Sequence, residues 1–135
     1  MDRDMTEETE PFADANLRIK VSVLNTIEQL NRLRDRYDEH KLDDVAWDLL
    51  LELLRAEQHD QRLSVSGLTV SVQGVSATTS LRRIGELGAR GYVARTPDSQ
   101  DRRRDFVELT ATARELLADY LARVDDCLTE PPGPR

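Results

Sequence analysis

The sequence predicts a mainly α-helical protein that carries one small β-hairpin. Long segments with apolar residues at steps of three and four predict helices near both ends of the chain. Between them, a glycine turn separates two short segments, and two β-prone segments flank an arginine-rich loop. With 135 residues, the chain fits one domain with a core of its own.

The N-terminal part is predicted to be a tail followed by a long helix. Residues 1–13 are acidic and polar, which is typical of a flexible tail that ends near Pro11. A helix is predicted over residues 14–39, because its apolar residues form one stripe on a charged helix. This stripe is longer than one neighbour can cover, which favours contact with a partner, with packing inside the chain as the alternative. Its members are Leu17, Val21, Leu24, Ile27, Leu30, Leu33 and Tyr37.

A second helix is predicted from Asp43 or Asp44 to about Glu57. Aspartate suits both the N-cap and the positive end of the helix dipole. The apolar face of this helix is broad and includes Trp47, so it should lie in the core. Residues 58–62 are predicted to form a polar loop, and Leu63 a short edge strand beside the hairpin.

Residues 64–72 are ambiguous when they are read alone. Their β-branched residues favour a strand, and Gly67 weakens a helix. The next residues along the chain favour a helix, because Gly74 and Val75 make a turn and Ser76 caps a further helix over residues 77–89. In that helix Ala77, Ile84 and Leu87 are predicted to point inward, with Leu81 at the margin. The pair forms a helix-turn-helix, and the glycine of Arg90-Gly91 ends its second helix.

The hairpin is predicted to join residues 92–95 to residues 106–109. Its loop holds Arg102, Arg103 and Arg104 in succession. Three guanidinium groups repel one another in the free protein, whereas a polyanion would neutralise all three. The segment therefore resembles the wing of a winged helix-turn-helix, and it points to DNA.

The last helix is predicted over residues 110–128, with Thr110 as its N-cap and a flexible tail over residues 129–135. The predicted organisation is a single winged helix-turn-helix domain over residues 14–128. Residues 43–109 form its DNA-binding core. Residues 14–39 and 110–128 are its N- and C-terminal dimerisation helices.

The charge of the chain is unevenly distributed. The whole chain carries a net charge of −7, yet residues 82–104 hold seven arginines against three carboxylates, a net charge of +4. Overall charge bears on solubility, whereas a local basic patch bears on a partner. The asymmetry favours nucleic acid.

Two motifs lie side by side around the wing. Asp98, Asp101 and Arg103 are followed by Val107, Leu109 and Thr110, in the pattern Asp-x-x-Asp-x-Arg and then Val-x-Leu-Thr. Residues 87–95 read Leu-Gly-Ala-Arg-Gly-Tyr-Val-Ala-Arg. Both motifs resemble the MarR family of bacterial transcriptional regulators, and the order of helices is similar from about residue 14 to residue 128. The resemblance implies a homodimeric, sequence-specific DNA-binding regulator, most often a repressor, on a pseudo-palindromic operator in double-stranded DNA.

The predicted DNA contacts lie on the recognition helix, residues 76–89, and on the wing, residues 92–109. The N-terminal side chains of such a helix reach base edges in the major groove. By the resemblance, Arg103 enters the minor groove and Asp101 orients it, while Arg102 and Arg104 touch phosphate. The predicted DNA-binding residues are Ser76, Thr78, Thr79, Arg82, Arg83, Arg102, Arg103 and Arg104.

The resemblance also implies a small-molecule effector, with Tyr37 and Trp47 as candidate pocket residues and plain core as the other interpretation. His40 and His59 lie in different connectors without partners at metal-ligand spacing, so no metal or other cofactor is predicted. Cys127 is interpreted as a small core residue, since nothing indicates the thiolate activation that a redox role needs.

Other functions find little support in the sequence. No P-loop, nucleophile elbow or dinucleotide fingerprint occurs, so an enzyme is not predicted. The acidic start is unlike a signal peptide, and we expect a cytoplasmic protein. The alternative function is a winged-helix protein-interaction module that no longer binds DNA, although such a module would not need Arg82 together with the arginines of the loop.

Overall fold

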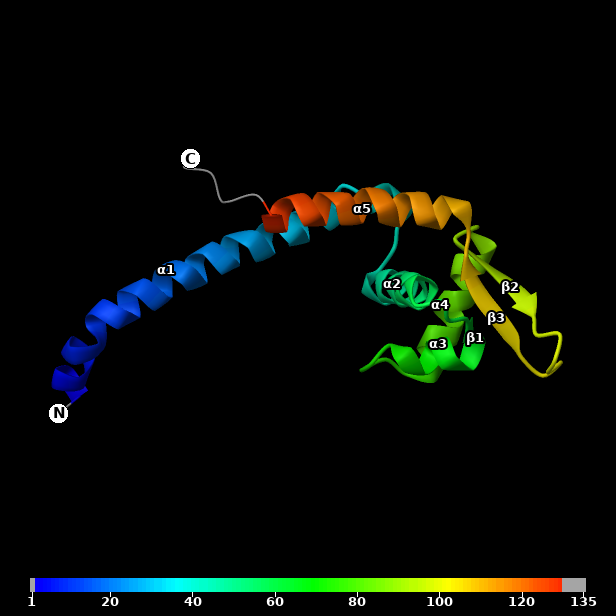
Figure 1. The fold of residues 1–135 in the computed structure, drawn as a ribbon, viewed down its shortest axis with the longest axis horizontal. Helices are drawn as coiled ribbons and strands as arrows, with labels where there is room; N and C mark the ends of the chain where they lie inside the picture. The colour runs from blue at the N-terminus through cyan, green and yellow to red at the C-terminus, as the bar shows by residue number, and fades with distance from the viewer. Residues whose placement is uncertain (1, 130–135) are drawn as a thin grey trace. The chain divides into compact units, whose positions relative to one another are not determined.

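The computed structural model describes the backbone of residues 2–129 and the side-chain surroundings of residue 18 and residues 20–129. In this range the chain forms two compact units: residues 37–121, and residues 2–36 together with 122–129. The elements succeed one another along the chain as in Figure 1: α1 (Asp2–Asp35), η1 (Asp38–His40), α2 (Asp44–Gln58), β1 (Leu63–Ser64), α3 (Val65–Ser71), α4 (Ala77–Ala89), β2 (Val93–Pro97), β3 (Asp105–Leu109) and α5 (Ala111–Thr129).

The smaller unit contains α1 and the end of α5. Helix α1 begins at Asp2, so the segment predicted as a tail is helical and Pro11 lies inside the helix. Proline has no backbone N–H to donate, so the helix continues past residue 11 with one hydrogen bond fewer. The predicted C-terminal tail lies outside the described residues except for Thr129, where α5 ends.

The helices of the larger unit begin at side-chain caps. The Asp43 carboxylate accepts a hydrogen bond from the Ala46 N–H at 2.9 Å and caps α2. Ser64 caps α3 in the same way, through the Gly67 N–H at 3.1 Å. The helical interpretation of residues 64–72 is therefore confirmed. Its β-branched bias is overridden because Leu68 is completely buried in the core.

The sheet has the order β1-β3-β2, and all neighbours are antiparallel. Leu63 pairs with Val107, which confirms the predicted edge strand. Arg95 also lies opposite Val107, and Val93 lies opposite Leu109. Val93, Val107 and Leu109 are buried, so this face of the sheet covers the helices and the other face is turned outward.

The core of the larger unit gathers apolar residues from α2, α3, α4, β3 and α5. The largest of the fully buried side chains are Leu49, Leu50, Leu68, Ile84, Leu87, Val107 and Leu117. The first half of α5 belongs to this core through Ala113, Leu116 and Leu117, so the unit extends beyond the predicted boundary at residue 109.

An aromatic cluster lies where the chain enters and leaves the larger unit. Tyr37, Trp47 and Tyr120 are all buried, and their ring centroids are 4.7–5.8 Å apart. The Tyr37 hydroxyl donates a hydrogen bond to the Asp119 carboxylate at 2.6 Å. Edge contacts between such rings and a satisfied hydroxyl stabilise a buried tyrosine. Separately, none of the helices in the described range has the length and apolar character that a membrane span needs.

Candidate nucleic-acid interface

Helix α4 ends in a tight turn that sends the chain into the hairpin. Arg90 is the C-cap, and Gly91 adopts a left-handed φ of 83° that favours glycine. The Gly91 N–H donates to the Gly88 carbonyl at 3.2 Å, and the Tyr92 N–H donates to the Leu87 carbonyl at 2.9 Å. This pair of bonds is the Schellman motif. It fixes the direction in which β2 leaves the helix, and hence the place of the wing beside α4.

The exposed face of α4 carries the predicted recognition side chains. Thr78 and Arg82 are exposed, and Thr79 is half-buried. The Ser76 hydroxyl caps the helix by accepting from the Thr79 N–H at 3.1 Å, and it also bonds the Thr79 hydroxyl at 3.0 Å. Four of the predicted residues therefore share the first turns of one helix.

The prediction that Ala77 points into the core is wrong. Ala77 is exposed, and the buried positions of α4 are Ser80, Ile84 and Leu87. The apolar stripe does pass through residue 77, but the first turn of α4 extends beyond its neighbours and borders an open groove. Helical periodicity gives the direction of a side chain and does not say where its covering neighbour ends.

Arg82 and Arg83 are adjacent but have different surroundings. The Arg83 Nε donates to the Asp43 carboxylate at 2.7 Å, and its Nη1 lies 3.4 Å from the Glu86 carboxylate. Arg82 makes no hydrogen bond or ion pair within the part of the chain that the structure describes. Of the two predicted DNA contacts, only Arg82 presents an unengaged guanidinium group.

The loop of the wing is closed by Asp98, whose side chain is 6% exposed. The Asp98 N–H donates to the Arg104 carbonyl at 3.2 Å. Its carboxylate accepts from the Gln100 N–H at 2.8 Å and from the Arg104 Nε at 2.7 Å. These bonds, first that from Gln100 and then that from Arg104, hold the pKa of Asp98 below its ordinary value of 3.8. The wing is therefore a closed loop with a charged residue at its base.

Asp101 holds Arg103 at the tip of the wing. Its Oδ1 accepts from the Arg103 backbone N–H at 3.0 Å and from the Arg103 Nε at 3.2 Å. The Arg103 side chain is 91% exposed. The hydrogen bond that the sequence predicted between these two residues is present, and it directs an extended guanidinium into solvent.

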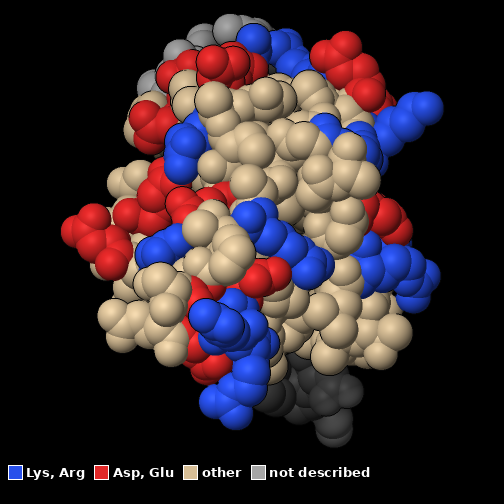
Figure 2. All heavy atoms as spheres, turned by 90° about the vertical axis from the view of Figure 1, so that its right-hand side faces the viewer, with Lys and Arg blue, Asp and Glu red and all other residues tan. Residues whose placement is uncertain are grey.

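An open groove of about 560 Å³ separates the start of α3 and α4 from the wing. Leu81, Ala77 and Val65 contribute apolar atoms to it. Its basic lining comes entirely from the hairpin: Arg95, Arg102, Arg103 and Arg104. Figure 2 faces the side of the molecule on which the hairpin lies, and Lys and Arg side chains spread over its centre and lower part with acidic side chains between them.

Arg95 was missed as a site residue in the sequence. Along β2 it lies two positions after Val93, so both side chains lie on the face that covers the helices. The Val93 side chain is buried between the sheet and the helices. Arg95 lies farther along the strand, where its side chain lines the groove. The period of two along the strand was the available signal. Neither Arg95 nor Arg102 has an ion-pair partner among the described residues.

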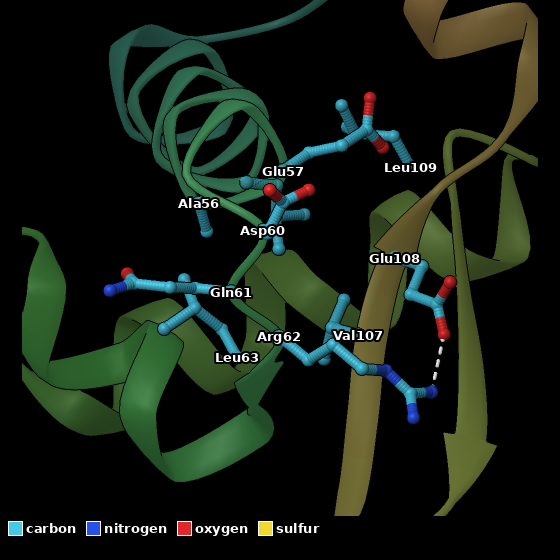
Figure 3. Close-up of a pocket in the computed structure, with 10 residues that line it drawn as sticks. Ala56, Glu57, Asp60, Gln61, Arg62, Leu63, Val107, Glu108 and Leu109 are labelled. Atoms are coloured by element: carbon cyan, nitrogen blue, oxygen red, sulfur yellow. Dashed lines mark hydrogen bonds and ion pairs between the residues drawn. The ribbon is translucent and has the colours of Figure 1, made fainter.

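A second hollow, of about 280 Å³, lies between the end of α2 and β3 (Figure 3). Its arginine and glutamate side chains are paired with one another or with a neighbour. Arg62 lies 2.6 Å from Glu108, the dashed line in Figure 3, and Glu57 lies 2.7 Å from Arg114. None of the predicted site residues lines this hollow.

The two histidines lie apart from the groove. His40 accepts or donates a hydrogen bond through Nδ1 to the Tyr92 hydroxyl at 2.8 Å, and His59 is exposed at the end of α2. Cys127 is half-buried. Among the residues with described side chains, no group of three or more His, Cys, Asp or Glu side chains is arranged to hold a metal ion.

Comparison with known proteins places the fold. No protein-family model matches the chain, and no curated protein matches it. Solved structures similar to it include transcriptional regulator Tm0710 from Thermotoga maritima, with 25% identity and a TM-score of 0.60 over 88% of this chain and 76% of that one. MepR from S. aureus bound to ethidium bromide has 16% identity and a TM-score of 0.67 over 82% of this chain and 75% of that one. Wild-type MarR from E. coli in its apo form has 19% identity and a TM-score of 0.60 over 84% of this chain and 78% of that one. The predicted fold is confirmed, and Tm0710 is a transcriptional regulator.

Proposed function

We propose that this chain, which has the winged helix-turn-helix fold of the MarR-family transcriptional regulators, binds specific sequences in duplex DNA as a homodimer. The observation that carries the proposal is the groove beside α4. Four arginines line it in a chain whose net charge is −7. Guanidinium groups bind phosphate oxygens in a planar, two-pronged geometry, and several of them together can neutralise several phosphates.

In the proposed complex, α4 enters the major groove with its N-terminal turns. Thr78 contacts a thymine methyl group or a phosphate, and Arg82 binds the O6 and N7 atoms of a guanine. Ser76 and Thr79, which already form the cap, lie where a helix N-terminus attracts a phosphate. Sequence preference then depends mainly on Arg82.

The wing follows the DNA backbone into the adjacent minor groove. Arg103 enters that groove, and Asp101 limits the directions that its guanidinium can take. Arg95, Arg102 and Arg104 face the phosphates between the two grooves. Their contribution should be to affinity and register, because phosphates carry no base sequence.

We propose repression as the regulatory role, on the resemblance to the family. A small-molecule effector is part of the proposal, and the MepR structure, which contains ethidium bromide, supports it by analogy. A regulator of this kind acts on the chromosome, which places it in the bacterial cytoplasm.

The test is binding of the protein to fragments of its source genome at several salt concentrations. Each phosphate that the protein neutralises adds about −0.9 to the slope of log K against log salt concentration, so we expect a steep linear decrease. A flat response, or no binding to any fragment at low salt, would contradict the proposal. That outcome would favour the winged-helix protein-interaction module instead.

A further inference from the structure

The connector between η1 and α2 is bonded to α4 at two places. At one, the Arg83 Nε donates to the Asp43 carboxylate at 2.7 Å. At the other, Arg90, the C-cap of α4, donates through its guanidinium to the carbonyls of His40 and Lys41. The connector therefore runs along α4 from its middle to its C-cap, and all these residues belong to the same compact unit.

Asp43 uses its two carboxylate oxygens for two purposes. Oδ1 accepts from the Ala46 N–H and caps α2, while Oδ2 accepts from Arg83 on α4. Burial raises the pKa of Asp43, but the Ala46 N–H and Arg83 lower it more, so the pKa lies below its ordinary value of 3.8. The carboxylate is ionised at neutral pH and joins the start of one helix to the side of another.

The apolar packing of α4 rests mainly on two large side chains. Ile84 and Leu87 are the large buried side chains of this helix. Ser80, one turn before Ile84, is small, and its hydroxyl has no hydrogen-bond partner among the described residues. Polar bonds are directional, so those to a neighbouring segment add contacts that fix how α4 is turned about its axis.

We infer that Asp43 is a positioning residue for the recognition helix α4. It acts through its bond to Arg83, which makes no contact with DNA. The inference rests on the proposed function. It replaces the sequence-based expectation that Arg83 contacts DNA.

Exposure and charge decide between the two roles of Arg83. The Arg83 side chain is 26% exposed, against 91% for Arg103. It lies between Asp43 and Glu86, so the three residues together carry a net charge of −1. A DNA phosphate that approached Arg83 would meet two carboxylates, and like charges repel at this range. Arg82, one residue earlier, has no such neighbours.

The adjacent arginines give a matched pair of variants, Arg83→Gln and Arg82→Gln. The probes are a duplex selected by the parent protein from a random pool and an unselected duplex of the same length. Arg82→Gln should weaken binding to the selected duplex. If Arg82 neutralises a phosphate, this variant should also reduce the salt slope by about 0.9. Arg83→Gln should leave the salt slope unchanged and lower the ratio of selected to unselected affinity about five- to tenfold, the size of one lost base contact.

Asp43→Asn provides the second arm, because asparagine caps helices as well as aspartate but carries no charge for Arg83. We expect the ratio of selected to unselected affinity to fall as much as in Arg83→Gln. The double variant should show little further decrease, because both changes remove the same contact. Thermal unfolding of each variant shows whether the domain is folded.

Two results would overturn the inference. One is a salt slope that falls in Arg83→Gln by as much as one phosphate contact, and the other is an unchanged affinity ratio in both Arg83→Gln and Asp43→Asn. If the parent binds neither duplex, or if Arg82→Gln has no effect on either one, the fault lies with the proposed interface itself.

Discussion

Arg103 lies at the tip of the wing, where its side chain makes its hydrogen bond to Asp101 and is otherwise in solvent. We predict that Arg103→Ala weakens DNA binding and leaves the free energy of unfolding unchanged, because exposed ion pairs contribute little to stability. Binding isotherms and thermal melts measure the two quantities. Arg55→Ala, which removes another exposed, paired arginine, is the control and should bind as the parent does. If Arg103→Ala binds DNA as well as Arg55→Ala does, Arg103 is not part of the interface.

Asp98 gives a prediction about pH. Its pKa is lowered in the folded protein, so its contribution to stability is complete above the ordinary value of 3.8. The contribution is lost as the pH falls from 3.8 through the lower pKa of the folded state. We therefore expect Asp98→Asn to be less stable than the parent at pH 7, with the difference shrinking below about pH 3.8. Urea melts over this range measure it, and a difference that is constant with pH would mean that the charge of Asp98 does not contribute to stability.

Single residues were predictable where their partners are close in the sequence. The motif placed Asp101 two positions before Arg103, and the two are bonded. Asp43 lies 40 positions before Arg83, and no local pattern connects them. A long-range ion pair depends on how two helices pack, which only the folded chain determines.

At the scale of elements, α4 and its N-cap hold two serines in opposite situations. The Ser76 hydroxyl caps the helix, whereas the Ser80 hydroxyl is buried without a hydrogen bond among the described residues. We predict that Ser80→Ala raises the free energy of unfolding by about 1 kcal/mol, since alanine favours the helix and removes an unsatisfied group. Ser76→Ala should lower it by about 1 kcal/mol through loss of the cap.

Chemical denaturation measures both changes, and each serine is the control for the other. A loss of stability in Ser80→Ala would mean that its hydroxyl has a partner, such as a bound water. Ser80→Ala should also leave DNA binding unchanged, because residue 80 faces the core.

Elements were predictable where a cap and a periodic pattern agree. The starts of α2 and α4 are explained by Asp43 and Ser76, and the hairpin is explained by alternation around a polar loop. For α3, propensity favoured a strand and only the neighbouring turn favoured a helix. The sequence misplaces the start of α1, because proline favours a helix boundary, whereas the helix continues through Pro11.

At the scale of the whole molecule, α1 presents apolar side chains that the described chain does not cover. Val21, Leu24 and Ile27 are 46–55% exposed. Exposed apolar stripes of this kind are typical of an interface, and a two-fold dimer buries the same stripe on both copies. It would place two recognition helices about 34–36 Å apart on a pseudo-palindromic site.

We predict that Leu24→Glu gives a monomer that binds the palindromic site poorly. Sedimentation at micromolar concentration measures the mass. Gln29→Glu, an exposed change of the same sign on the opposite side of the same helix, is the control and should remain dimeric. A parent protein that is monomeric and binds DNA one to one on a non-palindromic site would contradict the dimer.

The contact between Tyr37 and Tyr120 joins the first and last turns of the larger unit. The polypeptide therefore enters and leaves this unit through neighbouring positions. A segment with adjacent ends can be spliced into another chain, or excised from this one, without stretching either host. Gene fusion can therefore place the unit over residues 37–121 between two other flanking helices while its own core stays intact.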